Sequence, residues 1–96
     1  MVKKLVEQFD PDSIILFGSH ARGDAHADSD IDLLVILSFT GSKMEKQLEM
    51  RIALHEFRIA KDVIVTTPDE VERRRNIPGT IIQPALQEGK VLYARK

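Results

Sequence analysis

The chain has 96 residues, 43% hydrophobic and 30% charged, which is the composition of an ordinary soluble globular protein, and we expect one domain over residues 1–96. A formal net charge of -1 provides no overall basic field, so no direct contact with nucleic acid is expected. The sequence has no cysteine, which excludes disulfides and thiolate metal ligands. The first residues lack an apolar run of signal-peptide length and the later apolar runs are strand-sized. We therefore expect a cytoplasmic protein without a membrane segment.

The first half of the chain predicts alternating helices and strands. Apolar residues recur at helical spacing up to Phe9, and the pair Asp10-Pro11 ends that pattern. In chain order we predict a helix over 2–9, a buried strand over 14–17, a single helical turn over 19–22, a polar loop over 24–29 and a second strand ending at Leu37.

The second half continues this alternation. Ser42 and Glu45 have the spacing of a capping box, which predicts the start of a helix. An apolar stripe follows at roughly helical spacing, and we expect its histidine to lie on a face packed against the sheet. The stripe consists of Met44, Leu48, Ile52, His55 and Ile59.

The remaining elements follow in the same order. We predict a third strand over 62–65, a helix starting at Thr67-Pro68 and broken at 76–79, a short helix with Ile81, Ile82, Ala85 and Leu86, and a strand over 91–93. Pro84 is tolerable only near the first turn of its helix. The fold class is therefore α/β (α+β), a small mixed sheet backed by helices. Because so thin a sheet cannot bury every apolar helix face, some apolar surface should remain exposed.

A glycine-serine turn, Gly18-Ser19, leaves the first strand. Glycine lets a ligand approach the backbone closely, and the start of a helical turn presents backbone amides, so this turn is a candidate phosphate site. An ordinary strand-to-helix turn is the alternative. Other phosphate motifs do not fit, because Asp24 stands where a Walker A motif needs its lysine and the dinucleotide-binding fingerprint is missing.

Two aspartates, Asp30 and Asp32, open the second strand. Side chains alternate along a strand, so both carboxylates would project from one face, about 6–7 Å apart. Two like charges at the mouth of an apolar strand need a cation between them, and carboxylate oxygens suit magnesium. A capping or turn-forming role is the alternative for Asp30, whereas Asp32 lies within the strand pattern.

The spacing of these motifs, with ten residues between Gly18-Ser19 and Asp30-x-Asp32, resembles the signature of the DNA polymerase β-like nucleotidyltransferases. The chain is most similar to their smallest members, the minimal nucleotidyltransferases (MNT), over nearly its whole length. The resemblance implies the polymerase β-like palm fold, an ATP triphosphate held at the glycine-serine turn, and a third carboxylate, supplied here by Asp62. It also implies two magnesium ions bound by Asp30, Asp32 and Asp62. His20 departs from the pattern, since many relatives carry a basic residue there.

Several other charged residues lie near these motifs. Arg22, one turn past the phosphate-binding amides, could contact a phosphate or pair with Asp24 or Asp28. We interpret His20 and His26 as solvated loop residues. The run 73–75, three arginines, is most simply a solvated helix face, and a contact with an acidic partner or RNA is the alternative.

The resemblance also suggests an acceptor. Larger members of the superfamily carry acceptor-binding domains, and these 96 residues leave nothing over to build one. This fits the two-component systems in which an MNT antitoxin transfers AMP from ATP to a tyrosine of a helical HEPN-domain toxin. Two alternatives stay open. One is a nucleotidyltransferase for a small molecule such as an aminoglycoside, which an acidic cleft formed by a homodimer would favour. The other is a non-catalytic nucleotide-binding module that masks a partner.

Overall fold

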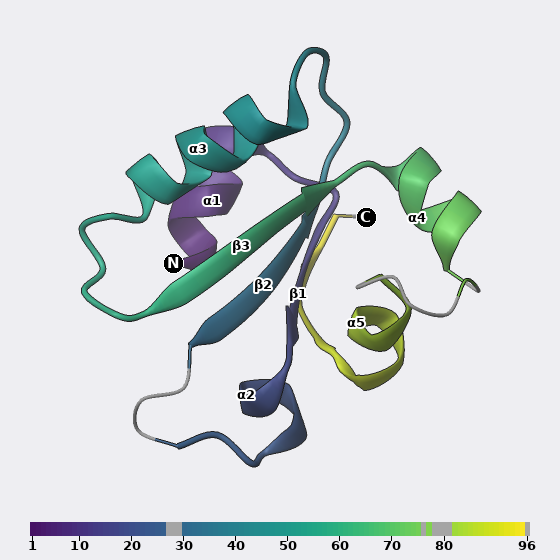
Figure 1. The fold of residues 1–96 in the computed structure, drawn as a ribbon. Helices are drawn as coiled ribbons and strands as arrows, with labels where there is room; N and C mark the ends of the chain where they lie inside the picture. Colours follow the sequence, from purple (N-terminus) through teal and green to yellow (C-terminus); the bar gives the residue numbers. More distant parts are fainter. Residues whose placement is uncertain (27–29, 76, 78–81, 96) are drawn as a thin grey trace.

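The structure is a computed structural model that describes residues 1–26, 30–75, 77 and 82–95. Helices and strands alternate along the chain, as predicted (Figure 1). In chain order they are α1 (Val2–Phe9), β1 (Ser13–Phe17), α2 (Ser19–Arg22), β2 (Ile31–Ile36), α3 (Lys43–Ala53), β3 (Lys61–Thr66), α4 (Pro68–Arg74), α5 (Ile82–Glu88) and β4 (Lys90–Ala94). Of the residues expected to break α4, only Ile77 is described, and Ile81 also lies outside the described residues.

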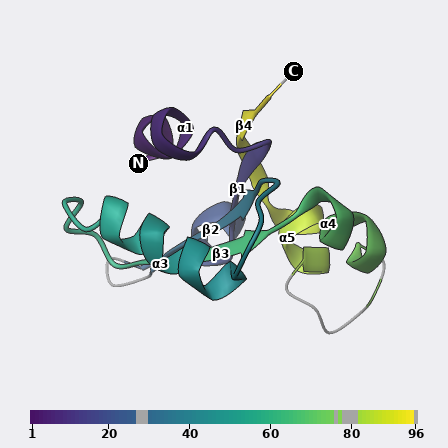
Figure 2. The ribbon, with the colours of Figure 1, turned by 90° about the horizontal axis from the view of Figure 1, so that it is seen from above.

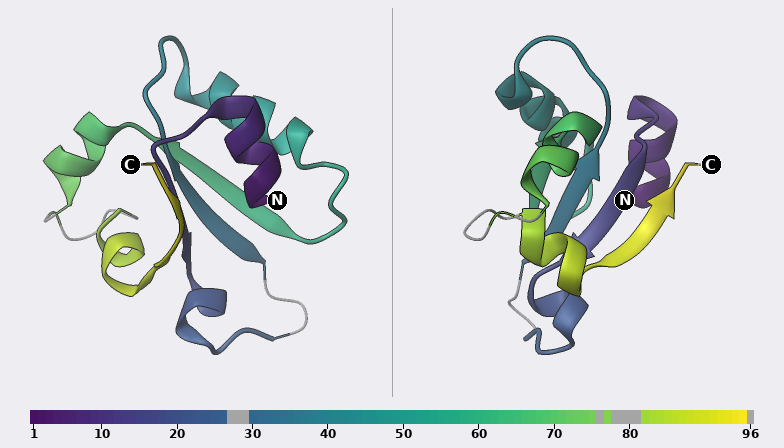
Figure 3. Two further views of the ribbon diagram at one scale, coloured as in Figure 1. Left: turned by 180° about the vertical axis from the view of Figure 1, so that it is seen from behind. Right: turned by 90° about the vertical axis from the view of Figure 1, so that its right-hand side faces the viewer.

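The strands form one mixed sheet in the order β3-β2-β1-β4. β2 and β3 are parallel, because α3 carries the chain back across the sheet between them, and β1 is antiparallel to both β2 and β4. β1 therefore ends where β2 and β3 begin. Figure 3 shows α2 at this end of the sheet, below the strands in both views. The predicted fold class is confirmed.

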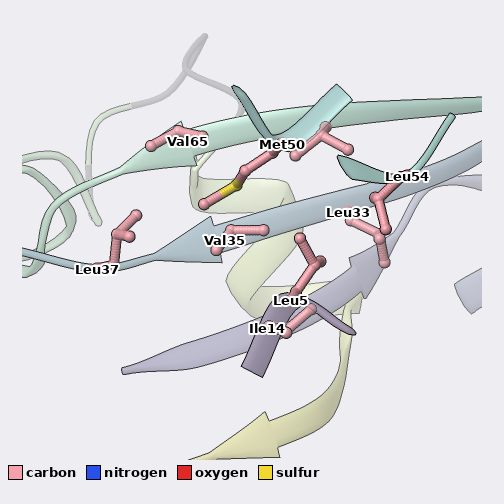
Figure 4. Close-up of a cluster of buried hydrophobic side chains, with 9 residues drawn as sticks. Leu5, Ile14, Leu33, Val35, Leu37, Met50, Leu54 and Val65 are labelled. Carbon is pink, nitrogen blue, oxygen red and sulfur yellow. The ribbon is translucent and has the colours of Figure 1, made fainter. Parts of the chain in front are cut away.

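Helices cover both faces of the sheet. Figures 1 and 2 show α1 and α3 on one side of the strands and α4 and α5 on the other. The side chains under α1 and α3 form the main core (Figure 4): Leu5, Ile14, Leu33, Val35, Leu37, Met50, Leu54, Val63 and Val65. The opposite face buries a smaller cluster: Ile15, Phe17, Leu34, Ile36 and Ala85. Alternate residues of each strand thus point to opposite faces, and both faces are needed to bury them.

Local capping explains where two helices begin. The Ser42 hydroxyl accepts a hydrogen bond from the Glu45 amide at 3.3 Å, which confirms the predicted start of α3. The Thr67 hydroxyl accepts one from the Glu70 amide at 3.2 Å, and Pro68 occupies the first helical position of α4. Pro84 lies in the first turn of α5, where the backbone amide that proline lacks would have no partner within the helix.

The orientation of α3 differs from the sequence-based interpretation. The helix ends at Ala53, so His55 and Ile59 lie beyond it, and both are exposed. The expectation that His55 packs against the sheet is therefore wrong. The residues of α3 that face the sheet are Met50 and Ala53, followed by Leu54 at the C-cap.

The outward side of α3 is apolar. Met44, Leu48 and Ile52 have exposed fractions of 78%, 58% and 67%, and we call these three residues the outer face of α3. The expectation that some apolar helix surface stays exposed is confirmed here. In α5, by contrast, Ile82 is buried and Leu86 packs against the smaller cluster. No helix in the described ranges has the length and apolar character that crossing a membrane requires.

Candidate active site

Gly18 turns the chain from β1 into α2. Its backbone has φ 77° and ψ -155°, which lies outside the regions open to residues with a side chain. The Gly18 carbonyl accepts hydrogen bonds from the amides of Ala21 and Arg22, both at 3.1 Å, and these bonds form the single turn of α2. Gly23 closes that turn in the left-handed conformation, and the predicted helical turn over 19–22 is confirmed. The half-buried Ser19 is therefore the first helical residue after the turn.

The carboxylate of Asp32 lies directly against Gly18. A Cβ atom placed on Gly18 would be 2.3 Å from Asp32 Oδ2, so any side chain at residue 18 would force this carboxylate to move. Glycine is thus favoured here for two reasons, its positive φ and the room that it leaves for the carboxylate of Asp32. The turn and the first strand-borne aspartate form one unit, although thirteen residues separate them in the sequence.

Asp32 and Asp62 are neighbours across the sheet. In the parallel pair β2–β3, Asp32 is in register with Asp62, and Asp32 is also in register with Phe17 at the end of β1. Residues in register on adjacent strands point to the same face, with the strands about 4.8 Å apart. Two of the three predicted carboxylates are therefore side by side at the end of the sheet that carries Gly18.

The third, Asp30, directly precedes β2 and is exposed. Its charge acts on Asp32. The pKa of Asp32 is raised by burial of its carboxyl group, then by the negative charges of Asp62 and Asp30. His20 and Arg22 lower the pKa of Asp32, but their effect is smaller. The site therefore has an excess of negative charge that a hard divalent cation would neutralise, and its all-oxygen donors suit Mg²⁺.

An arginine that the sequence did not single out contacts Asp62. Arg51 in α3 donates through Nη2 to Asp62 Oδ1 at 3.1 Å, and both side chains are partly exposed. Within the part of the chain that the structure describes, no three side chains of His, Cys, Asp or Glu converge closely enough to hold one metal ion. Asp62 is instead paired with a guanidinium.

Arg22 is held by two carboxylates. Its Nε is 3.3 Å from Asp24 Oδ2 and its Nη1 is 3.6 Å from Glu88 Oε2, and these contacts raise the pKa of Arg22, the Asp24 contact most. One of the two expected pairings is confirmed, and Asp28 lies outside the described residues. Because Arg22 also lowers the pKa of Asp32, its positive charge acts on the site. The predicted contact between Arg22 and a phosphate remains a prediction.

Other candidates lie further from this chemistry. The arginines of 73–75 are exposed, as expected for a solvated helix face, with Arg75 paired to Glu72 at 3.3 Å. A cleft of about 570 Å³ lies between α1 and the segment after α3, where it is lined by residues such as Lys4, Glu7 and Phe57. None of the candidate carboxylates lines it, so we locate the site by its chemistry and not by cavity size.

A glycine turn beside in-register carboxylates suits an enzyme that acts on a metal-bound phosphate ester, and comparison with known proteins identifies the class. The family model described as polymerase beta, nucleotidyltransferase, matches residues 1–96. The chain belongs to this family. A Methanocaldococcus jannaschii protein named "Putative protein adenylyltransferase" is 36% identical over 55 residues, which are 57% of this chain and 54% of that protein. The chain thus spans about half the length of this curated relative.

Solved structures share the fold. A chain in a crystal structure of a toxin-antitoxin with AMP-PNP superposes with a TM-score of 0.65 at 24% identity, covering 99% of this chain and 71% of that chain. A chain in the structure of a tri-AMPylated Shewanella oneidensis HEPN toxin in complex with MNT antitoxin gives a TM-score of 0.56 at 21% identity, covering 98% and 66%. At these identities the similarity establishes the fold alone.

Proposed function

We propose that this nucleotidyltransferase transfers AMP from ATP to a tyrosine of a HEPN-type toxin and thereby acts as its antitoxin. The observation that carries the proposal is the in-register pair Asp32–Asp62 beside the Gly18 turn. This arrangement brings carboxylates and backbone amides to one end of the sheet, where a metal-bound triphosphate needs both. We propose that the protein is located in the cytoplasm, where ATP and magnesium are abundant.

Each candidate residue has a separate role in this proposal. Asp30, Asp32 and Asp62 would hold two Mg²⁺ ions, around which their side chains would have to close, since the three do not converge in the described structure. The amides after Gly18 would hold the triphosphate. When bound, the metal lowers the pKa of the attacking hydroxyl and stabilises the leaving pyrophosphate. Asp32 lies against Gly18 on the inner strand β2, whereas Asp62 lies on the edge strand β3. Asp62 is therefore the carboxylate best placed to face an incoming acceptor.

Three observations support a protein acceptor. One relative is named as a protein adenylyltransferase, and one structure of this fold contains a tri-AMPylated HEPN toxin with its MNT antitoxin. In addition, the outer face of α3 leaves three large apolar side chains exposed. α3 also carries Arg51, which contacts Asp62, so a partner bound to the outer face would lie beside the third carboxylate. We propose that the toxin covers this face.

The experiment is a transfer assay with a HEPN-type toxin as the acceptor, to be sought in the reading frame next to the one that encodes this chain. Incubation with ATP and Mg²⁺ should add the mass of AMP to a toxin tyrosine, which intact-mass and peptide mass spectrometry detect. Asp62→Asn should bind the toxin and add nothing. If Asp62→Asn still modifies the toxin, the catalytic assignment is wrong. If the unmodified toxin is neutralised equally well by wild type and variant, a masking module without catalysis is the correct description.

A further inference from the structure

The ion pair between Arg51 and Asp62 joins two elements that belong to different layers. α3 packs on the face of the sheet that holds the main core, which includes Leu33 and Val63. Asp32 and Asp62 are in register with each other and precede these two residues, so both point to the opposite face. β3 is an edge strand, so the Arg51 side chain can reach past it to the opposite face. The guanidinium therefore lies at the site without belonging to the turn or to the strands that build it.

Arg51 is not needed to attach α3 to the sheet. Met50, Ala53 and Leu54 already bury the inward side of this helix. Gln47 adds a polar link, because its side-chain oxygen accepts a hydrogen bond from the Val65 amide of β3 at 3.0 Å. An exposed ion pair adds little to this packing, since such pairs contribute about 0–1 kcal/mol. The position of Arg51 thus calls for an explanation other than fold stability.

Resting on the proposed function, in which Asp62 is a metal ligand, we propose that Arg51 is a positioning residue that holds Asp62 in the metal-free enzyme and releases it when the metal and nucleotide bind. A guanidinium and a divalent cation are alternative partners for the same carboxylate oxygens. While Arg51 donates to Asp62 Oδ1, that oxygen is occupied by the guanidinium. Arg51 therefore lowers the affinity of the empty enzyme for metal and keeps the third carboxylate ordered until substrate arrives.

The test is a titration of the nucleotide-free protein with Mn²⁺, in which the electron paramagnetic resonance signal of free Mn²⁺ measures how much of the metal is bound. Arg51→Gln should bind Mn²⁺ about two- to fivefold more tightly than wild type, which matches the strength of an exposed ion pair. The midpoint of thermal unfolding in chelator should fall by at most about 4–8 °C, because the pair contributes no more than about 1 kcal/mol. Arg75→Gln is the matched control, because it breaks a similar exposed pair, in which Arg75 Nη1 at the C-cap of α4 is 3.3 Å from Glu72 Oε2. This variant should bind Mn²⁺ with wild-type affinity.

A double-mutant cycle separates the ion pair from general electrostatics. If Arg51 acts through Asp62, adding Arg51→Gln to Asp62→Asn changes nothing further. An equal gain in both backgrounds would show that any nearby positive charge has this effect and would overturn the proposal. Unchanged or weaker Mn²⁺ binding by Arg51→Gln alone would overturn it as well. If neither wild type nor Arg51→Gln binds Mn²⁺, with or without ATP, the proposed function fails together with it.

Discussion

Gly18 and Asp32 are in direct contact, and a Cβ atom at Gly18 would stand 2.3 Å from Asp32 Oδ2. The glycine thus shapes the carboxylate site as well as the turn. Any side chain at residue 18 must displace the aspartate that we assign to the metal, in addition to straining a backbone with φ 77°.

Gly18→Ala should therefore lose both stability and nucleotide binding. Strain at positive φ costs about 1–3 kcal/mol, and the clash with Asp32 adds to it. Gly41→Ala is the matched control, because Gly41 has φ 94° but no atom within 4 Å of the added Cβ. The control should show the strain alone and keep wild-type ATP affinity, as measured by urea unfolding and by calorimetry. Equal ATP binding by Gly18→Ala and Gly41→Ala would place the phosphate elsewhere.

Asp32→Asn should stabilise the metal-free protein at neutral pH. Because the pKa of Asp32 is raised in the folded state, folding favours the protonated carboxyl, and its contribution to stability is present at low pH and lost as pH rises through the folded pKa. Asparagine does not ionise. In chelator, the variant should show a midpoint of thermal unfolding that rises relative to that of wild type as the pH is raised from about 4 to about 7. It should also lose AMP transfer by at least about a hundredfold. A variant less stable than wild type at neutral pH would indicate a structural aspartate.

ATP binding should require a divalent cation. The triphosphate and the carboxylates of Asp30, Asp32 and Asp62 carry like charges. Of these three carboxylates, Arg51 pairs with that of Asp62 alone among the residues that the structure describes. Calorimetric titration of ATP should therefore give binding with Mg²⁺ and none with a chelator. The same affinity in both conditions would contradict the assignment of the aspartates to a metal.

The parts of the site that depend on neighbouring residues could be predicted from the sequence. The Gly18-Ser19 turn and the caps at Ser42 and Thr67 each involve a few adjacent residues. The face of the sheet to which Asp32 points follows from the alternation of side chains along its strand. The Arg51–Asp62 pair could not be predicted in this way. Its residues are 11 positions apart, and they meet only because the chain crosses the sheet and β3 becomes an edge strand.

The orientation of α3 was ambiguous for a different reason. The sequence of α3 and the residues just after it contains two apolar stripes, the outer face and a second stripe through Met50, Ala53, Leu54 and Phe57. Helical periodicity fits both, and only the packing against the sheet buries the second one. The compact spacing of that second stripe, at i, i+3, i+4 and i+7, was the available signal.

The last prediction separates partner binding from folding on this helix. Leu48→Glu changes an exposed residue of the outer face, so the free energy of unfolding should stay within about 0.5 kcal/mol of wild type. Met50→Ala, on the buried side, should cost about 2–5 kcal/mol. A partner that covers the outer face would have to bury the new carboxylate, so its affinity for Leu48→Glu should fall at least about tenfold.

Ile59→Glu is the matched control for charge, because Ile59 is an apolar residue of 50% exposure that lies outside α3. It should bind the toxin as wild type does, and both variants should bind ATP with Mg²⁺ normally. Affinity can be measured by biolayer interferometry with immobilised toxin. Wild-type affinity for Leu48→Glu would exclude the outer face as the contact surface. Equal losses in Leu48→Glu and Ile59→Glu would instead show that the toxin responds to the net charge of the enzyme, since the two substitutions share only that change.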